Sequence, residues 1–204
     1  MWKKILYINS GHSLSQPGAV SALGEKEADI TIKIRDEVIP LLQGQGFEVQ
    51  IVPDYLDLAS SIYWVNQRAK NLDDGFCLEI HLNAGGGQGA EAFYYTGDKE
   101  AKNFTNIFIN AYCKETGFLN RGAKPDNQSA VGKLGWIRDT NTRSLLIECG
   151  FIDNPDDLKK IKDFKKTAMG IAKGICEIYG VYFVIGSDNK ELIKAEIIKL
   201  LNQL

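Results

Sequence analysis

Short apolar runs alternate with longer helix-like stretches along most of this chain. Five of the short runs have the length and composition of β-strands, at residues 4–9, 47–52, 76–81, 91–95 and 144–148. Four longer stretches carry apolar residues at helical spacing, at residues 27–42, 58–72, 99–114 and 163–179. Strands that alternate with helices are joined by crossover connections, which give parallel pairing. The pattern predicts an α/β fold: a three-layer, mostly parallel twisted sheet covered by helices.

The last part of the chain differs from the rest. Residues 186–189 read Gly-Ser-Asp-Asn, a linker-like break, and residues 190–204 again place apolar residues at helical spacing. The whole chain has 204 residues, the size of one ordinary domain. We therefore expect one domain over residues 1–180, with a linker and a short C-terminal helical appendage over residues 181–204. That helix packs on the domain, mediates self-association or belongs to a second module.

The composition argues against two classes of partner. Lysine and arginine total 24 against 26 aspartates and glutamates, so no excess positive charge is available to neutralise the phosphates of a nucleic acid. No window approaches the ~18 apolar residues of a membrane-spanning helix, and the apolar run near the N-terminus is too short for a signal peptide. We expect neither nucleic-acid binding nor membrane insertion. We expect a cytoplasmic protein whose export uses a route that its own N-terminus does not encode.

The chain contains only two histidines, and both follow predicted strands. His12 comes after the first strand, and His81 closes the third. Glu148 ends a strand that is otherwise apolar, where a carboxylate is costly to bury without a partner or a cation. Glu27 begins the first predicted helix, which follows the loop after the first strand. Because the carboxyl ends of parallel strands meet at one edge of a sheet, we expect these four side chains to converge.

The residue types expected at this edge are those of a zinc site. Two imidazoles and one carboxylate are a common ligand set for catalytic Zn²⁺, with a fourth position left open. A further carboxylate can act as general base and acid beside such a metal. Each residue also has an ordinary explanation: a partly buried histidine, a helix-start acid favoured by the dipole for Glu27, or a structural ion pair for Glu148. The joint placement of all four favours a metal-dependent active site.

Five short motifs connect the chain with a known family. They are residues 11–13 (Gly-His-Ser), 17–19 (Pro-Gly-Ala), 27–32 (Glu-Ala-Asp-Ile-Thr-Ile), 79–84 (Glu-Ile-His-Leu-Asn-Ala) and 147–154 (Ile-Glu-Cys-Gly-Phe-Ile-Asp-Asn). In this combination the chain resembles the zinc-dependent N-acetylmuramoyl-L-alanine amidases, type-3 catalytic domain, found in phage endolysins and bacterial autolysins. The resemblance covers roughly residues 4–180. With Asn-Arg-Gly-Ala-Lys at residues 120–124, it looks most like clostridial phage endolysins.

The resemblance implies a role for each residue of the predicted site. His12, Glu27 and His81 would hold one Zn²⁺ per chain, and Glu148 would be the catalytic acid and base. The family pattern fits Glu27 better than Glu25, which is the alternative ligand. The substrate would be bacterial peptidoglycan. The enzyme would cleave the amide between the lactyl group of N-acetylmuramic acid and L-alanine of the stem peptide.

Four further residues are candidates for supporting roles. Asn83 follows the strand of His81 and is expected to contact substrate. Arg121 and Lys124 are expected to meet carboxylates of the stem peptide, unless they are ordinary surface charges. Glu79 lies two residues before His81, so both side chains point to the same face of their strand. Glu79 is expected to fix the tautomer of that imidazole, or else to be bonded elsewhere beneath the site.

Three other functions fit the same residues. A bacterial autolysin or sporulation amidase shares the chemistry of a phage endolysin, and the lack of a signal peptide favours the endolysin, which a holin would release. Another zinc hydrolase of the cell wall, a carboxypeptidase or deacetylase, is compatible with the same ligand set. A cell-wall-binding module with a decayed site is the non-enzymatic alternative. The presence of all four polar residues argues against that module.

Overall fold

The computed structural model describes residues 3–13 and 15–185. Within these residues six strands form one sheet in the order β2-β1-β3-β6-β4-β5. The strands are β1 (Ile5–Asn9), β2 (Glu48–Ile51), β3 (Phe76–Asn83), β4 (Ala90–Tyr94), β5 (Asn120–Pro125) and β6 (Arg143–Phe151). Every neighbouring pair is parallel except β4 and β6, which run antiparallel. The helix predicted at residues 190–204, with its suggested role in self-association, lies outside the described residues.

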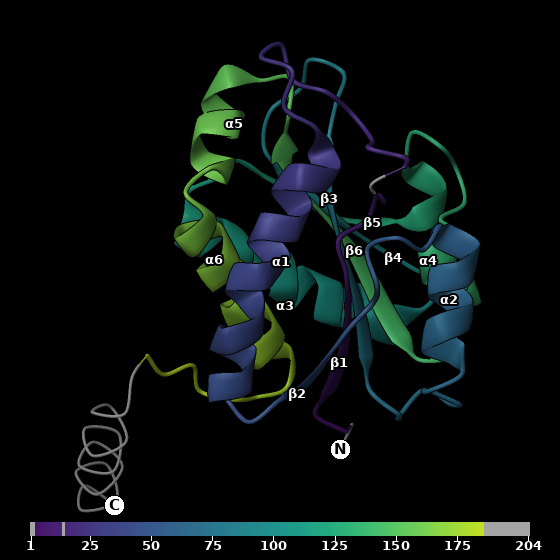
Figure 1. Cartoon of the computed structure of the whole chain (residues 1–204). Coiled ribbons are helices and arrows are strands. Elements are labelled where there is room, and N and C mark those ends of the chain that lie inside the picture. The colour runs from purple at the N-terminus through teal and green to yellow at the C-terminus, as the bar shows by residue number, and fades with distance from the viewer. Residues whose placement is uncertain (1–2, 14, 186–204) are drawn as a thin grey trace, which may run out of the picture.

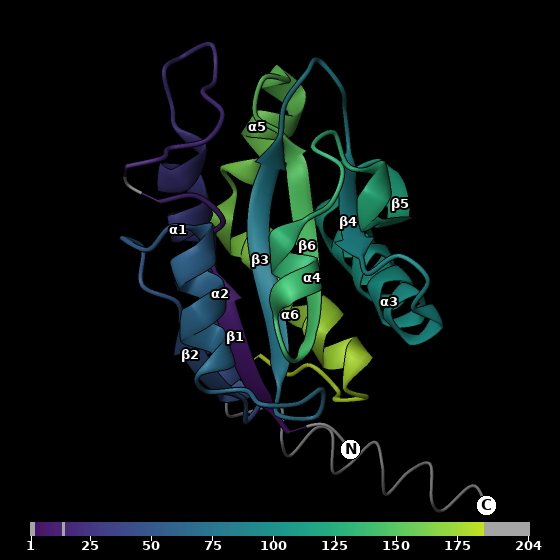
Figure 2. The same ribbon diagram turned by 90° about the vertical axis from the view of Figure 1, so that its right-hand side faces the viewer.

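Helices cover both faces of the sheet, which confirms the predicted α/β class (Figures 1 and 2). The helices are α1 (Glu27–Gly44), α2 (Leu58–Asn66), α3 (Lys99–Thr116), α4 (Gly135–Asp139), α5 (Pro155–Ile161) and α6 (Phe164–Ile178). Helices α1, α3 and α6 bury the larger core, which includes Leu78 and Ile147 of the sheet. Helices α2 and α4 lie over Tyr7, Cys77 and Leu146 on the other face. None of the helices in the described part of the chain is long and apolar enough to span a membrane.

The helical layer formed by α2 and α4 is short. Helix α2 has 9 residues and α4 has 5, whereas α1 and α3 have 18 each. Strand residues that face this layer change from apolar to polar along the strand. On β3, Cys77 is followed on the same face by Glu79, His81 and Asn83. The polar half of this face borders a cleft, and it carries His81 and Glu148, two of the residues predicted to form the site.

Three elements of the structure were not expected from the sequence: β5, α4 and α5. Strand β5 reads Asn-Arg-Gly-Ala-Lys-Pro, without apolar alternation, and lies at the edge of the sheet. Helices α4 and α5 have 5 and 7 residues, too few to display a helical period. The helix predicted at residues 58–72 ends at Asn66. The Asn66 side chain donates a hydrogen bond to the carbonyl of Asp139 at 2.7 Å, which ties this helix end to the last residue of α4.

Strands β3 and β6 extend beyond their predicted ends. Strand β3 continues to Asn83 and β6 to Phe151. The prediction that His81 and Glu148 end their strands is therefore wrong, because the strands pair once more, at Asn83 and Phe151. Within the parallel pair, His81 and Glu148 are direct neighbours in register. The two side chains consequently point to the same face of the sheet.

Candidate active site

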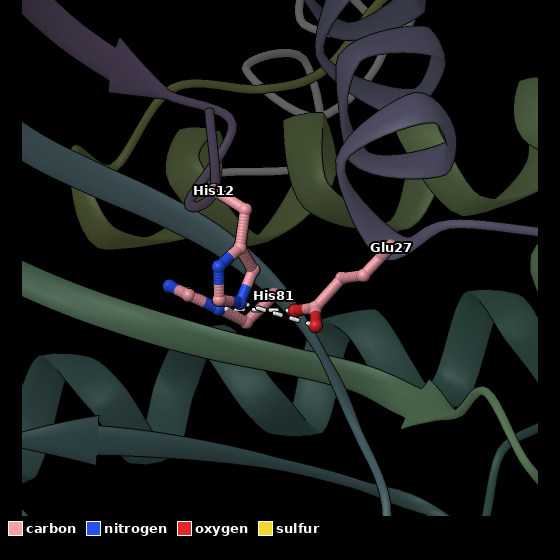
Figure 3. A group of neighbouring side chains, drawn as sticks. All are labelled: His12, Glu27 and His81. Carbon is pink, nitrogen blue, oxygen red and sulfur yellow. Dashed lines mark hydrogen bonds and ion pairs between the residues drawn. The ribbon is translucent and has the colours of Figure 1, made fainter. Parts of the chain in front are cut away.

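Three side chains that are far apart in the sequence meet at one point (Figure 3). His12 lies in the loop after β1, Glu27 is the first residue of α1, and His81 lies on β3. The Oε2 atom of Glu27 is 3.1 Å from His12 Nε2, and its Oε1 atom is 3.1 Å from His81 Nδ1. One possible ligand atom from each residue lies within 4.8 Å of the other two. The cluster has the residue types and the spacing of a metal site.

The backbone around Glu27 holds its carboxylate in place. Oε2 accepts a hydrogen bond from the N–H of Ala19 at 2.9 Å, and Oε1 accepts one from the N–H of Leu82 at 2.8 Å. Gly18 allows the loop to pass this close to the cluster. Its φ is +73°, and a Cβ atom there would lie 2.5 Å from Glu27 Oε2 and 2.4 Å from His12 Cδ2. Glycine alone suits this conformation and this space, which explains its place in the Pro-Gly-Ala motif.

The structure brings Glu27, and not Glu25, into the cluster. The Oε1 atom of Glu25 accepts a hydrogen bond from Lys162 Nζ at 2.7 Å. The side chain of Glu25 is 30% exposed, whereas that of Glu27 is 3% exposed. The alternative ligand is therefore engaged in an ion pair at the surface.

Glu148 lies beside the cluster on the neighbouring strand. Its Oε2 atom is buried and has no hydrogen-bond partner among the described residues. Burial raises the pKa of Glu148 to about 8; the positive charge of His81 opposes this rise, and the negative charge of Glu27 adds to it. A buried carboxylate without a partner is costly. Its presence next to three potential metal ligands points to a chemical role.

Protons stabilise the cluster when no cation is bound. Burial alone would raise the pKa of Glu27, but hydrogen bonds from His12 and His81 outweigh it and hold that pKa well below its usual range. Burial alone would lower the pKa of His81, but hydrogen bonds with Glu27 and Glu79 outweigh it and raise that pKa well above its usual value. A divalent cation would replace these protons. Two imidazoles and an ionised carboxylate fit Zn²⁺.

Glu79 lies next to His81 on the same face of β3. Its Oε2 atom is 3.4 Å from His81 Nε2, and its Oε1 atom accepts a hydrogen bond from Asn9 Nδ2 at 2.8 Å. Both ring nitrogens of His81 therefore face carboxylates, because Nδ1 faces Glu27. A proton on Nε2, shared with Glu79, leaves Nδ1 available to a metal.

The cluster opens into a cleft of about 440 Å³. His12, Glu27, His81 and Glu148 all line it. Its remaining walls come from the start of α2 and from the segment that leads into α4, with apolar side chains of Leu58, Val131 and Leu134. Apolar walls around a few convergent polar groups are the usual form of a small-ligand site.

The three residues predicted to contact substrate share a partner that the sequence did not reveal, Glu91. Asn83 lines the cleft, and its Nδ2 atom donates a hydrogen bond to Glu91 Oε1 at 2.9 Å. Arg121 Nε and Lys124 Nζ both donate to Glu91 Oε2, at 2.7 and 2.5 Å. In the sequence Glu91 is one acid in a short apolar strand, and its cationic partners follow 30 and 33 residues later. Only the pairing of β4 with β5 brings them together.

The raised pKa of Glu148 has a consequence for stability. In metal-free protein, the change Glu148→Gln is expected to increase the free energy of unfolding above pH 8 by about 5 kcal/mol. The unfolded chain loses this proton near pH 4.5 and the folded chain near pH 8. The free energy of unfolding therefore falls as pH rises across that window. Glutamine does not ionise, so the variant lacks this pH-dependent loss. Urea unfolding at pH 5 and pH 8.5 measures the difference; equal stability at pH 8.5 would contradict the assigned burial.

Comparisons with known proteins identify relatives over most of the chain. Residues 6–177 match the family described as N-acetylmuramoyl-L-alanine amidase. The chain is 28% identical over 181 residues to the amidase CwlM of Bacillus licheniformis, covering 86% of this chain and 69% of that protein. It is 30% identical over 191 residues to an endolysin of Bacillus phage SPP1, covering 86% and 66%. The catalytic domain of CwlV, an amidase from Bacillus (Paenibacillus) polymyxa var. colistinus, superposes with a TM-score of 0.74 at 25% identity, covering 89% of this chain and 100% of that one.

Proposed function

Because the chain belongs to the N-acetylmuramoyl-L-alanine amidase family, we propose that it cleaves the amide between the lactyl group of N-acetylmuramic acid and L-alanine of the peptidoglycan stem peptide. The observation that carries the proposal is the convergence of His12, Glu27 and His81 in a cleft. Beside them, Glu148 offers a buried carboxylate with no partner among the described residues. The proposed roles of these four residues follow from that arrangement.

His12, Glu27 and His81 would hold one Zn²⁺ per chain. When bound, the metal would polarise the substrate carbonyl and lower the pKa of a water molecule. Two backbone N–H groups already fix the Glu27 carboxylate. The low pKa of Glu27 keeps this ligand ionised. The protein thus supplies an oriented anionic ligand before any metal arrives.

Glu148 would move the protons of the reaction. Its carboxylate accepts a proton from the attacking water and returns it to the amine of L-alanine as the amide bond breaks. Without a metal, burial raises its pKa to about 8. The positive charge of a bound Zn²⁺ would lower this pKa and favour the ionised form that accepts the proton. Because its Oε2 atom has no partner in the described structure, no existing hydrogen bond has to be broken first.

Metal removal tests the proposal. Purified peptidoglycan is incubated with the protein, and new amino groups are counted with and without a zinc chelator. The chelator is expected to abolish their release, and one equivalent of Zn²⁺ per chain is expected to restore it. Mg²⁺, which prefers oxygen ligands, serves as the control and is not expected to restore activity. Full activity in metal-free protein would contradict the zinc site.

Glu79 is proposed to orient the imidazole of His81. The change Glu79→Gln is expected to weaken Zn²⁺ affinity by about 10- to 100-fold, because the amide holds the ring less firmly than the carboxylate. Competition with a chromophoric chelator measures this affinity. Glu177→Gln, at an exposed position on α6, is the control and retains the parent affinity. An unchanged affinity for Glu79→Gln would leave Glu79 only its hydrogen bond to Asn9.

Asn83, Arg121 and Lys124 are proposed to contact the substrate. Asn83 lines the cleft beside His81. Arg121 and Lys124 pair with one carboxylate, Glu91, so the three groups sum to one net positive charge. Their side chains are 33% and 28% exposed and so remain accessible to a ligand. A positive charge at this position suits the carboxylates of a stem peptide.

The biological setting is proposed to be that of a phage endolysin, which resides in the cytoplasm until it is released to the wall. The 30% identity to the endolysin of Bacillus phage SPP1 supports this setting. The 28% identity to CwlM supports the alternative, a bacterial autolysin or sporulation amidase. The position of the gene separates the two. A neighbouring gene for a membrane pore-forming protein would support the endolysin, and a sporulation locus would contradict it.

A further inference from the structure

Glu91 is a buried carboxylate that the proposed reaction does not use. It lies on β4 and is 5% exposed. Both of its oxygen atoms are engaged, since Oε1 accepts from Asn83, and Oε2 accepts from Arg121 and Lys124. The guanidinium of Arg121 also lies 5.0 Å from the centre of the Phe151 ring. Three donors from two other strands are therefore gathered on one acid.

Glu91 lies directly beside Glu148, the proposed proton carrier. The two residues are direct partners in the antiparallel register of β4 and β6. Directly opposite residues share a face of the sheet, with Cβ atoms about 5 Å apart. One of the two carboxylates binds two cations, whereas the buried Oε2 atom of the other has no partner in the described structure.

The two cations bound to Glu91 would need another partner if Glu91 were absent. Arg121 and Lys124 are two-thirds or more buried, so each requires an anionic partner nearby. Without Glu91, Glu148 would offer these cations a carboxylate on the same face, one strand away. The lysine side chain is a flexible four-carbon stem that adapts to a new partner. An ion pair with Lys124 would occupy the oxygen atoms of Glu148 and make it a weaker base.

We propose that Glu91 is a positioning residue that holds the cations of Arg121 and Lys124 away from Glu148. This inference rests on the proposed role of Glu148 as proton carrier. Glu91 touches no reacting atom, and it acts through the two cations and through Asn83. The alternative is a purely structural role, in which the same network only fixes β5 to β4 and does not affect the chemistry. The two roles make different predictions for a double variant.

The test compares Glu91→Gln with the double variant Glu91→Gln/Lys124→Met, using a soluble muramyl peptide as substrate. Glu91→Gln is expected to lower kcat by about 10- to 100-fold with a smaller change in KM, because the freed lysine pairs with Glu148. The double variant is expected to recover at least fivefold in kcat over Glu91→Gln, because the more flexible of the two competing cations is gone. Its KM is expected to rise, because Lys124 is also proposed to contact the substrate. Glu91→Asp keeps the charge and is expected to retain kcat within a few-fold.

A matched control tests the effect of losing an ion pair elsewhere, and two checks test folding. Glu115→Gln removes an ion pair with Lys173, on helices that pack against the opposite face, and is expected to leave kcat and KM unchanged. Zinc content and thermal unfolding show whether each variant is folded. The inference would be overturned if the kcat of the double variant were as low as that of Glu91→Gln, or lower. An unchanged kcat in folded Glu91→Gln would overturn it as well.

A crystal structure of Glu91→Gln tests the inference independently of activity. We expect a cationic nitrogen of Lys124 or Arg121 within hydrogen-bond distance of the Glu148 carboxylate. Cations that turn to solvent and leave Glu148 unpaired would contradict it. Absence of amidase activity in the parent protein would defeat the proposed function, and this structural result would still decide where the cations go.

Discussion

Replacing Glu148 by alanine is expected to lower kcat by about 10³-fold while one Zn²⁺ per chain is retained. General acid–base catalysis by a positioned side chain contributes about 10²- to 10⁴-fold. Glu148 would serve both proton transfers, so the loss lies well within that range. The metal is expected to be retained, because Glu148 is not part of the group of possible ligands that the described residues form. Steady-state kinetics on a muramyl peptide and metal analysis on the same sample measure both quantities.

The control for this variant is Glu177→Ala, at an exposed position on α6. It removes one carboxylate from the molecule without touching the cleft and is expected to keep full activity. Glu148→Gln separates proton transfer from packing, because glutamine fills the same space and cannot carry the proton. Retention of parent kcat in both Glu148 variants would show that the proton carrier is another group.

Replacing His81 by alanine is expected to remove the metal and, with it, all measurable turnover. In the proposed site His81 would contribute one of two neutral nitrogen ligands. Without it, Glu27 would be left with His12 as its only partner in the cluster. Two ligands do not form the three-ligand site typical of catalytic zinc. We expect zinc occupancy below one tenth after dialysis against a weak chelator, as measured by atomic absorption.

The interpretation of this variant depends on its fold. Removal of His81 leaves the carboxylates of Glu27 and Glu79 close together in a buried region, so His81→Asn is a second variant with a polar side chain of intermediate size. Both are checked by circular dichroism. Full zinc occupancy in a folded His81 variant would overturn the proposed ligand set.

The parts of the fold that carry strong local patterns could be predicted from the sequence. Apolar runs such as residues 144–148 identified the central strands, and helical spacing identified α1, α3 and α6 within a few residues. Strand β5 could not be predicted, because it is polar and acquires its strand structure only by pairing with β4. The lengths of β3 and β6 also depend on their pairing rather than on local sequence.

Some residues of the candidate site could likewise be predicted from the sequence, and others could not. His12, His81 and Glu148 could be predicted because polar side chains at the ends of apolar runs are unusual, and the family motifs supplied their expected roles. Glu91 could not be found, because an acid in an apolar strand has no signature until β4 is placed beside β6 and β5. The destination of Arg121 and Lys124 was unpredictable for the same reason.

Mass spectrometry of peptidoglycan digested by the purified protein identifies which bond the protein cleaves. We predict stem peptides that begin with a free L-alanine amino group, together with glycan whose lactyl groups end in free carboxylates. Both products should disappear with a zinc chelator and return when Zn²⁺ is restored. Intact lactyl–alanine bonds, with loss of terminal D-alanine or of acetyl groups instead, would contradict the account and identify a different zinc hydrolase of the wall.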